Sequence, residues 1–365
     1  MTVRRLVVKI GSSLLVDQEG QLRHVWLDSL AEDLAACRAR GQEVIVVTSG
    51  AIALGRRALG LRSGSLRLED QQAAAAVGQI NLAHAYQASL ARQGLATAQL
   101  LLTLADTENR RRYLNARSTV EALLRFGVVP VVNENDTVAT TEIRFGDNDR
   151  LSARVAVMAS ADQLILLSDV DGLYTGHPGE NPGAVRIELV IAITPEIEAM
   201  AGGAGSQTGT GGMVSKLAAA KIATRAGCTV VLAPGAGSRP LTRLEQDGPC
   251  TRFPARENPR RARKEWIAAA LGTMGVVRID GGAARALRRG SSLLPAGVVA
   301  IEGSFERGDP VLVKDPDGRD LAKGLSAYDA EDARRILGHN TRAIAELLGY
   351  RGRDELIHRD DLVLL

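Results

Sequence analysis

A lysine interrupts the first strongly apolar segment of the chain. Residues 3–10 read VRRLVVKI and are followed by Gly-Ser-Ser, which predicts a buried strand that ends in a turn. A charged ammonium inside such a strand is costly unless it is paired or functional, so Lys9 is a candidate for binding an anion. The alternative is a lysine at the strand end whose ammonium reaches out to solvent.

Two short segments further along concentrate carboxylate and amide side chains. Residues 133–136 read NEND, and residues 147–149 read DND. Such groups can bind an ammonium group through carboxylates and a carboxylate through amide donors, and recognition of a polar amino acid requires both. Ordinary turn chemistry is the alternative, because Asn and Asp favour turns for local reasons.

Glycine-rich turns that lead into helices are candidates for binding phosphate, above all TGTGGMVSK at residues 208–216. Bare backbone N–H groups at a helix N-terminus attract anions. Neither a P-loop, G-x-x-x-x-G-K-[ST], nor a G-x-G-x-x-G fingerprint after the first strand is present, so a P-loop enzyme is excluded and a Rossmann dehydrogenase is disfavoured. A flexible surface loop is the alternative for each glycine-rich turn.

The elements that must position these residues alternate along the first part of the chain. Strands are predicted at 3–10, 43–48, 96–103, 128–132, 163–168 and 229–233, and helices at 25–40, 71–79, 114–126, 149–159 and from near Lys216. This alternation predicts an α/β fold, a mostly parallel sheet sandwiched by helices. Ligands bind such sheets at the carboxyl ends of the strands, so we expect the polar and glycine-rich segments to gather there.

The pattern changes after about residue 265. Short apolar segments separated by Gly, Pro and Asp predict a small β-rich barrel or sandwich, with a helix or two within 329–348. Before it, the stretch TRFPARENPRRARK is strongly basic, which is typical of a linker or an interface rim, with a phosphate-contacting patch as the alternative. We expect an α/β domain over 1–251, a basic linker over 252–274 and a β-rich domain over 275–365.

The composition excludes several classes of protein. The chain has 365 residues, 45% hydrophobic and 24% charged, which is ordinary for a soluble globular protein, and its net charge of +3 implies no polyanion partner by itself. The Cys and His residues show no disulfide or zinc spacing. No apolar run reaches the roughly 18 residues that span a membrane, and the N-terminus does not read as a signal peptide. We therefore expect a cytoplasmic protein.

Taken together, several segments closely resemble the glutamate 5-kinases of the amino acid kinase family. The matching segments are VVKIGSSLL (7–15), VTSGAIALGRRALGL (47–61), NENDTVATTEIRFGDNDRLSARVA (133–156), LLSDVDGLYTGHP (166–178) and GTGGMVSKLAAAKIA (209–223). SSLLPAGV, EGSFERGD and the terminal HRDDLVLL resemble the PUA domain that many bacterial members carry. Ser215 stands where threonine is more usual in the family, and it keeps the hydroxyl.

The resemblance implies ATP-dependent phosphorylation of the γ-carboxylate of L-glutamate to L-glutamyl 5-phosphate, the first step of proline biosynthesis. ATP and Mg²⁺ are the expected cofactors. The resemblance also implies proline as a feedback inhibitor, a homo-oligomer, and hand-off of the product to a glutamyl phosphate reductase.

The site residues follow from the resemblance together with the positions described above. We expect three catalytic residues, with the aspartate organising both lysines: Lys9, Lys216 and Asp149. The expected glutamate site consists of Ser49, Asn133, Asp136, Asp147 and Asn148. The expected ATP site consists of Lys9, Gly11, Ser168, Asp169, Thr210, Gly211, Gly212, Met213, Val214, Ser215 and Lys216.

This chemistry needs no general base, because a glutamate side chain with a pKa of about 4.3 is already ionised at pH 7. The difficulty is that an anionic carboxylate must approach a polyanionic γ-phosphate, which requires cations and positioning. We expect the two lysines to reach the phosphate from opposite sides. The N–H groups of Gly11 and of residues 211–212 are expected to stabilise the equatorial oxygens.

Two other classes of function stay open. PUA domains are best known in proteins that bind or modify RNA, but residues 276–365 have a small acidic excess and only three aromatic residues, Phe305, Tyr328 and Tyr350. An RNA platform should be basic and offer aromatic side chains for stacking, so these residues argue against RNA. A kinase with a different acyl acceptor is the other alternative, because the residues alone do not determine the substrate.

Overall fold

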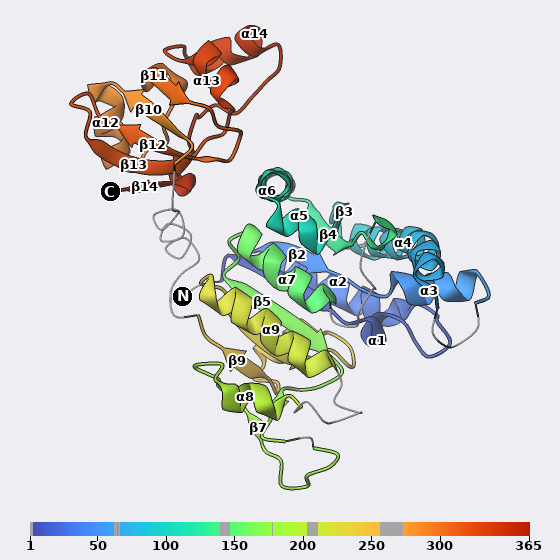
Figure 1. The fold of residues 1–365 in the computed structure, drawn as a ribbon. Coiled ribbons are helices and arrows are strands. Elements are labelled where there is room, and N and C mark those ends of the chain that lie inside the picture. Colours follow the sequence, from blue (N-terminus) through green and yellow to red (C-terminus); the bar gives the residue numbers. More distant parts are fainter. Residues whose placement is uncertain are drawn as a thin grey trace. The chain divides into compact units, whose positions relative to one another are not determined.

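The computed structural model describes residues 3–61, 64, 66–138, 147–176, 178–202, 211–255 and 273–365. The chain divides into two compact units, Met1–Pro259 and Arg260–Leu365, which are described separately (Figure 1). The expected end of the first domain, after residue 251, falls inside an edge strand of the first unit, β9 (Thr251–Phe253). Arg252 is exposed there between two buried neighbours, so one basic residue of the expected linker belongs to the sheet.

The first unit is built around a seven-stranded sheet in the order β3-β4-β2-β1-β5-β8-β9. Its other strands are β1 (Arg5–Ile10), β2 (Glu43–Val47), β3 (Thr97–Leu102), β4 (Val129–Glu134), β5 (Gln163–Ser168) and β8 (Thr229–Pro234). All neighbours pair in parallel except β8 and β9. The expected mostly parallel sheet is confirmed.

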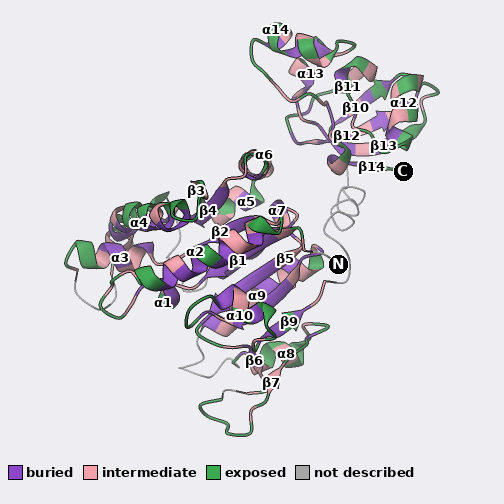
Figure 2. Cartoon of the chain, turned by 180° about the vertical axis from the view of Figure 1, so that it is seen from behind, coloured by how far each residue is buried: buried purple, intermediate pink, exposed green. Residues whose placement is uncertain are grey.

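Helices cover both faces of this sheet, which explains why its central strands are apolar at nearly every position. On one face, Val8 and Ile10 of β1 share a core with α2 (His24–Ala39), α4 (Leu68–Ala91) and α10 (Pro240–Glu245). On the other face, Val7 shares a core with α6 (Arg110–Arg125), α7 (Asp147–Met158) and α9 (Gly211–Arg225). Figure 1 shows α7 and α9 across that second face, and Figure 2 shows the strands from behind as a buried layer. Because side chains alternate along a strand, Lys9 belongs to the face of α7 and α9.

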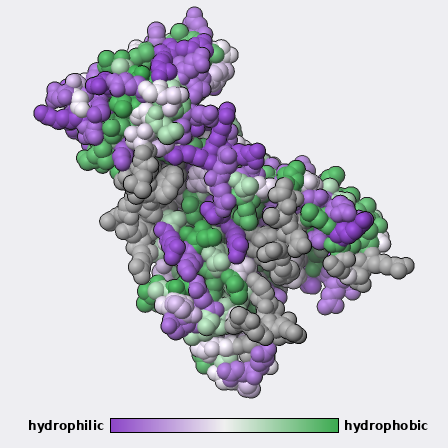
Figure 3. All heavy atoms as spheres, in the orientation of Figure 1, coloured by the Kyte–Doolittle hydropathy of each residue, from purple (hydrophilic) through white to green (hydrophobic). Residues whose placement is uncertain are grey.

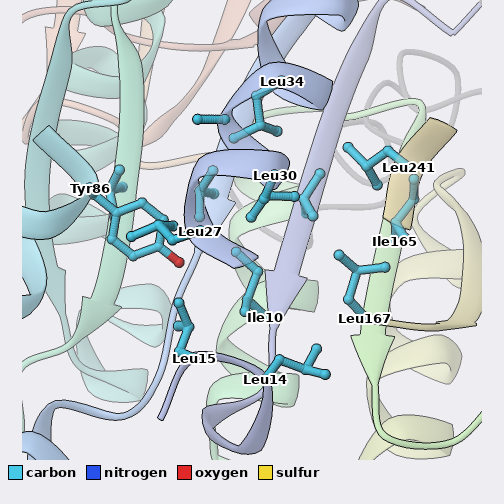
Figure 4. Packing of buried hydrophobic residues seen from close by; sticks show 14 of the residues in the cluster. Ile10, Leu14, Leu15, Leu27, Leu30, Leu34, Tyr86, Ile165, Leu167 and Leu241 are labelled. Carbon is cyan, nitrogen blue, oxygen red and sulfur yellow. The ribbon is translucent and has the colours of Figure 1, made fainter. Parts of the chain in front are cut away.

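The core is almost entirely aliphatic, as a chain with 3% aromatic residues requires. Leu27 and Leu30 of α2 pack in the same cluster as Ile10 of β1 (Figure 4). Among the described residues of the first unit, the buried aromatic members of the core are Trp26, Tyr86 and Phe253. Tyr86 of α4 is 1% exposed, and its hydroxyl forms a 3.0 Å hydrogen bond with the hydroxyl of Thr48. A buried phenol needs such a partner, and this bond ties α4 to the segment that follows β2.

Helix α3 (Ala51–Ala58) crosses α4 at very short range, and two glycines make the crossing possible. A Cβ atom at Gly55 would lie 1.7 Å from the carbonyl oxygen of Ala74, and one at Gly78 would lie 1.8 Å from that of Ala51. No side chain fits in either place. The crossing therefore holds α3, which begins directly after the Ser49–Gly50 turn, tightly against α4.

Shorter elements complete the first unit: α1 (Ser12–Leu15), α5 (Leu104–Glu108), the 3₁₀ helix η1 (Asp136–Val138), β6 (Leu173–Tyr174), β7 (Arg186–Ile187) and α8 (Pro195–Met200). One sequence prediction is wrong, because α9 begins at Gly211 rather than near Lys216. Glycines have a low helix propensity because they lose the most backbone freedom on folding. The packed apolar face of the helix stabilises it against their low propensity.

The second unit contains a five-stranded sheet in the order β11-β10-β12-β13-β14, with its own hydrophobic core. The elements are β10 (Gly275–Ile279), α12 (Gly281–Arg288), η2 (Pro295–Gly297), β11 (Val298–Gly303), β12 (Pro310–Lys314), β13 (Asp320–Leu325), α13 (Ala330–Ile336), η3 (Thr341–Ala343), α14 (Ile344–Leu348), η4 (Arg359–Asp361) and β14 (Leu362–Leu364). The stretch 329–348 thus holds two helices, and Gly338, at φ +75°, lies between them. The predicted β-rich character of this part is confirmed.

Hydrophilic and hydrophobic residues are interspersed over the visible surface of each unit (Figure 3). Helix α4, the longest of the helices in the described residues, has 24 residues and carries Glu69 and Asp70 in its first turn. Within the described ranges, no helix combines the length and the apolar character needed to cross a membrane.

Candidate active site

A cavity of about 620 Å³ opens at the carboxyl ends of β4, β2, β1 and β5, which are neighbours in the sheet. Helices α3, α7 and α9 contribute their first turns to it. It brings together residues that the sequence analysis assigned to catalysis, to the glutamate site and to the ATP site: Lys9, Gly11, Ser49, Asn133, Asp136, Asn148, Asp149, Ser168, Asp169, Gly212, Met213 and Lys216.

None of the remaining expected site residues is among the described residues that line the cavity. Thr210 and the side chain of Asp147 lie outside the described residues. Gly211 is the first residue of α9. Val214 is 48% exposed and is not among the residues that line the cavity. Ser215 is buried behind the cavity wall, where its hydroxyl donates a 2.6 Å hydrogen bond to Oδ2 of Asp149.

Asp149 joins the two lysines. Its side chain is 1% exposed at the start of α7; Oδ1 lies 2.5 Å from Nζ of Lys9, and Oδ2 lies 3.5 Å from Nζ of Lys216. Lys9 comes from β1, and Lys216 comes from α9, where its Nζ also donates to the carbonyl oxygen of Gly212 at 3.1 Å. The aspartate thus connects a strand and two helices, and it holds both ammonium groups at the cavity wall.

This cluster carries one positive charge in excess, since one carboxylate faces two ammonium groups. Burial raises the pKa of Asp149, but the charges of Lys9 and Lys216 outweigh it and hold that pKa below its ordinary value. Burial lowers the pKa of Lys9 and the charge of Lys216 lowers it further, and the carboxylates of Asp149 and Asp169 offset these effects only in part. A buried cation with an incomplete set of counter-charges favours binding of an anion in the cavity.

Gly11 lines the cavity, but its backbone N–H donates to the carbonyl oxygen of Leu167 at 3.3 Å. That hydrogen bond continues the β1–β5 ladder beyond the end of the strand. The N–H group therefore already has a partner in this structure, which differs from the expectation that it stabilises phosphoryl oxygens. At the neighbouring turn, Gly50 adopts φ +99°, a conformation that favours glycine, directly before α3.

The amide and carboxylate groups line the cavity at the end of β4, which two strands separate from β5 in the sheet. Asn133 at the end of β4 is 2% exposed, and Asp136 in η1 is 8% exposed. Asn148 reaches the same cavity from the first turn of α7. The carboxyl end of one strand and the start of one helix thus place the two polar segments together, as their positions in the sequence predicted.

Four polar residues in the cavity wall were missed from the sequence: Ser12, Ser13, Arg56 and Gln71. Arg56 comes from α3, and Gln71 comes from α4. Arg56 lies in the segment 47–61 that carried the resemblance, and its charge in the second turn of the helix after a Ser-Gly turn was a usable signal. Gln71 stands in an alanine-rich helix whose sequence contains no indication of a site.

The described residues fit a magnesium ion only together with a phosphate-bearing ligand. In the part of the chain that is described, no three His, Cys, Asp or Glu side chains are grouped to hold a metal. Asp169 offers an exposed carboxylate in the cavity wall, and the hydroxyl of Ser168 donates to it at 2.8 Å. Mg²⁺ keeps several waters and commonly binds through one or two carboxylates plus phosphates, which this donor set can satisfy.

Comparison with known proteins identifies the family. Residues 4–234 match the amino acid kinase family, and residues 275–348 match the PUA domain. Glutamate 5-kinase from Paramagnetospirillum magneticum is 60% identical over 362 residues, which cover 99% of this chain and 98% of that protein. Glutamate 5-kinase from Ruegeria sp. is 57% identical over 364 residues, 100% of this chain and 99% of that protein.

A solved structure agrees at the level of the fold. Carbamate kinase from Giardia lamblia bound to AMP-PNP matches with a TM-score of 0.50 at 16% identity, over 69% of this chain and 98% of that one. The family match covers the unit that contains the cavity, and the relatives match both units. The chain therefore belongs to the amino acid kinase family, among the glutamate 5-kinases, and carries a PUA domain.

Proposed function

We propose that this protein transfers the γ-phosphoryl group of ATP to the γ-carboxylate of L-glutamate and so forms L-glutamyl 5-phosphate, the first step of proline biosynthesis. The observation that carries the proposal is the position of Lys9 and Lys216 around Asp149, between the amide-rich and the glycine-rich parts of one cavity. The high identity to relatives named glutamate 5-kinase supports the same reaction.

The reaction proceeds without a general base. An oxygen of the ionised γ-carboxylate attacks the γ-phosphorus, the bond to the β–γ bridging oxygen breaks, and ADP leaves with that electron pair. No proton is transferred at the attack, because the carboxylate is already deprotonated. The two lysines offset the repulsion between carboxylate and phosphate, and they stabilise the charge on the transferring group.

Asp149 orients the lysines and does not react. Its lowered pKa keeps it ionised, so it can hold Lys9 and Lys216 by charge throughout the neutral range. The first turn of α9 and the Ser168–Asp169 segment would bind the nucleotide, and Mg²⁺ would supply additional positive charge on its phosphates. The wall formed by Asn133, Asp136 and Asn148 would bind the amino acid, with Ser49 beside it.

The lowered pKa of Lys9 predicts how the rate depends on pH. Lys9 must be protonated to attract phosphate, so kcat/KM for ATP should fall on the alkaline side at a pH below 10.5, its ordinary pKa. Bound phosphates raise that pKa again, so the corresponding fall in kcat should occur at higher pH. Initial rates between pH 6 and about 10.5 at varied ATP would check this. If kcat/KM for ATP and kcat fell at the same alkaline pH, the role of Lys9 would be contradicted.

The division of the cavity into two parts is tested with Asn148→Ala. We expect the KM for glutamate to rise by about 10- to 150-fold, because one hydrogen bond to a charged ligand contributes roughly 1.5–3 kcal/mol, with little change in the KM for ATP. ADP release would be measured with a panel of acidic amino acids and dicarboxylates. A wild-type enzyme that turns over another acid faster than glutamate would overturn the proposed substrate, and a matching loss of ATP affinity would overturn the division.

Proline is proposed to bind to the same amino-acid part of the cavity. It offers an α-carboxylate and a secondary ammonium but no γ-carboxylate, so it can use these contacts without being phosphorylated. In the same assay of ADP release, proline added at varied glutamate concentrations should inhibit competitively with glutamate. The homo-oligomer and the hand-off to a glutamyl phosphate reductase rest on the resemblance alone and stay predictions.

The second unit offers little for an RNA ligand. Phe305 and Tyr328 are 4% and 3% exposed and belong to its core, which leaves Tyr350, at 49%, as the one exposed aromatic residue of 276–365. Single-stranded RNA is bound largely by stacking on exposed aromatic side chains and by basic surface. These positions favour an enzyme over an RNA-binding protein.

A further inference from the structure

Asn133 is held by a residue that does not itself reach the cavity. In β4, Val131 belongs to the core on the side of α4, and alternation places Asn133 on that same face. Its Nδ2 donates a 2.7 Å hydrogen bond to Oε1 of Gln79, in the middle of α4. Gln79 is not among the residues that line the cavity, whereas Asn133 is.

The other end of the Asn133 amide is a buried acceptor. Among the described residues, Oδ1 of Asn133 forms no hydrogen bond, and the same holds for Oδ1 of Asn148. Both side chains line the cavity. Buried polar atoms nearly always have a partner, because an unpaired one loses its hydration without compensation. Two such acceptors in one cavity wall therefore indicate a ligand that brings N–H donors.

An α-ammonium group matches this arrangement. It has N–H donors that point in different directions and a positive charge, so it can donate to both amide oxygens. The carboxylate of Asp136 lines the same part of the cavity. A ligand that carries only carboxylates would leave both amide oxygens unpaired.

We propose that Gln79 is a positioning residue that fixes the Asn133 amide with its oxygen toward the cavity, and so makes the site select an amino acid over a bare dicarboxylate. This inference rests on the proposed function and deepens it. The neighbouring residue, Gly78, lies in close contact with α3, so Gln79 follows directly on the point where α4 crosses α3.

The orientation of this amide decides what the site can bind. If the Asn133 side chain turned by 180°, its NH₂ group would face the ammonium of the ligand and repel it. Gln79 holds the present orientation through its Oε1, because an oxygen can pair only with the NH₂ group of Asn133, while the NH₂ group of Gln79 stays turned away from Asn133. Glutamate at position 79 offers acceptors only, whereas leucine offers neither donor nor acceptor and has a similar volume.

The test compares Gln79→Leu with Gln79→Glu, and uses Gln87→Leu, an exposed glutamine on the same helix, as the matched control. For Gln79→Leu we expect the KM for glutamate to rise about 3- to 10-fold, the effect of one neutral hydrogen bond, with kcat and the KM for ATP little changed. The inhibition constant of glutarate, which has both carboxylates but no ammonium, should stay the same. Gln79→Glu should restore the KM for glutamate toward the wild-type value, and Gln87→Leu should change nothing.

Non-additivity gives a second measurement that separates positioning from a general loss of structure. In an Asn133→Ala background, Gln79→Leu should no longer change the KM for glutamate, because the residue acts through Asn133. Equal losses for glutamate and glutarate, an unchanged KM in Gln79→Leu, or a Gln79→Glu variant as impaired as Gln79→Leu would each overturn the proposal. If Gln79→Leu does not fold, the Gln79→Glu result decides by itself. If the wild-type enzyme does not phosphorylate glutamate in the substrate panel, the proposed function fails. That outcome is separate from the failure of the Gln79 proposal, which is measured on the variants.

Discussion

Replacing Asp149 by asparagine is expected to lower kcat by about 10²–10³, with a smaller effect on either KM. Asn keeps the shape of the side chain but turns an NH₂ group or a neutral oxygen toward Lys9 and Lys216, which lie 2.5 and 3.5 Å from the present carboxylate oxygens. The buried Lys9 also loses the charge that offsets its burial, so its pKa falls further and less of it stays protonated. Stopped assays at saturating substrate would measure the loss, which should be smaller at lower pH.

Asp33→Asn is the matched control for this prediction. Asp33 is 2% exposed and accepts hydrogen bonds from the backbone N–H of Leu241 at 2.7 Å and the hydroxyl of Thr242 at 2.5 Å, away from the cavity. Its replacement should lower the free energy of unfolding by about 1–3 kcal/mol and leave kcat of the folded enzyme unchanged. An Asp149→Asn enzyme with wild-type kcat, or an equal loss in both variants, would contradict the role assigned to Asp149.

Gly78→Ala is expected to lower the free energy of unfolding by about 3 kcal/mol or more, at the upper end of what overpacking costs. The added Cβ would lie 1.8 Å from the carbonyl oxygen of Ala51 and 2.6 Å from the backbone nitrogen of Gly55, and backbone atoms cannot turn aside. The helices α3 and α4 must then move apart. Because Ser49 precedes α3 and Gln79 follows Gly78, the KM for glutamate should rise as well. Denaturant unfolding and steady-state kinetics would measure the two effects.

Gly281→Ala is the control for that substitution. Gly281 is also a helical glycine, but a Cβ there would meet only the end of the Arg285 side chain, at 3.6 Å. We expect a change of no more than about 0.5–1 kcal/mol, in the stabilising direction if the helix tolerates it. A Gly78→Ala protein as stable as wild type would show that the α3–α4 crossing can relax, and the packing argument would fail.

Much of this fold was predictable because a doubly covered parallel sheet leaves a strong pattern. Continuous apolar runs such as 163–168 mark buried strands, and polar or glycine-rich segments at their carboxyl ends mark the site. Lys9 was identified for a local reason: a charge in the middle of such a run must have a partner or a function. The position of 133–136 and 147–149 in the same cavity followed from the parallel order of the strands.

The sequence by itself determined which residue types are available and at which edge of the sheet they gather, because strand periodicity and turn residues are local properties of the chain. Only the tertiary structure decided which groups pair. The contacts of Asp149 with both lysines, the hydrogen bond from Asn133 to Gln79, and the glycine contact between α3 and α4 each join segments that are far apart in the chain. Such contacts depend on how individual side chains pack between helices and strands. A residue such as Gln79 therefore gives no sign in the sequence of whether it faces solvent or holds a binding group in place.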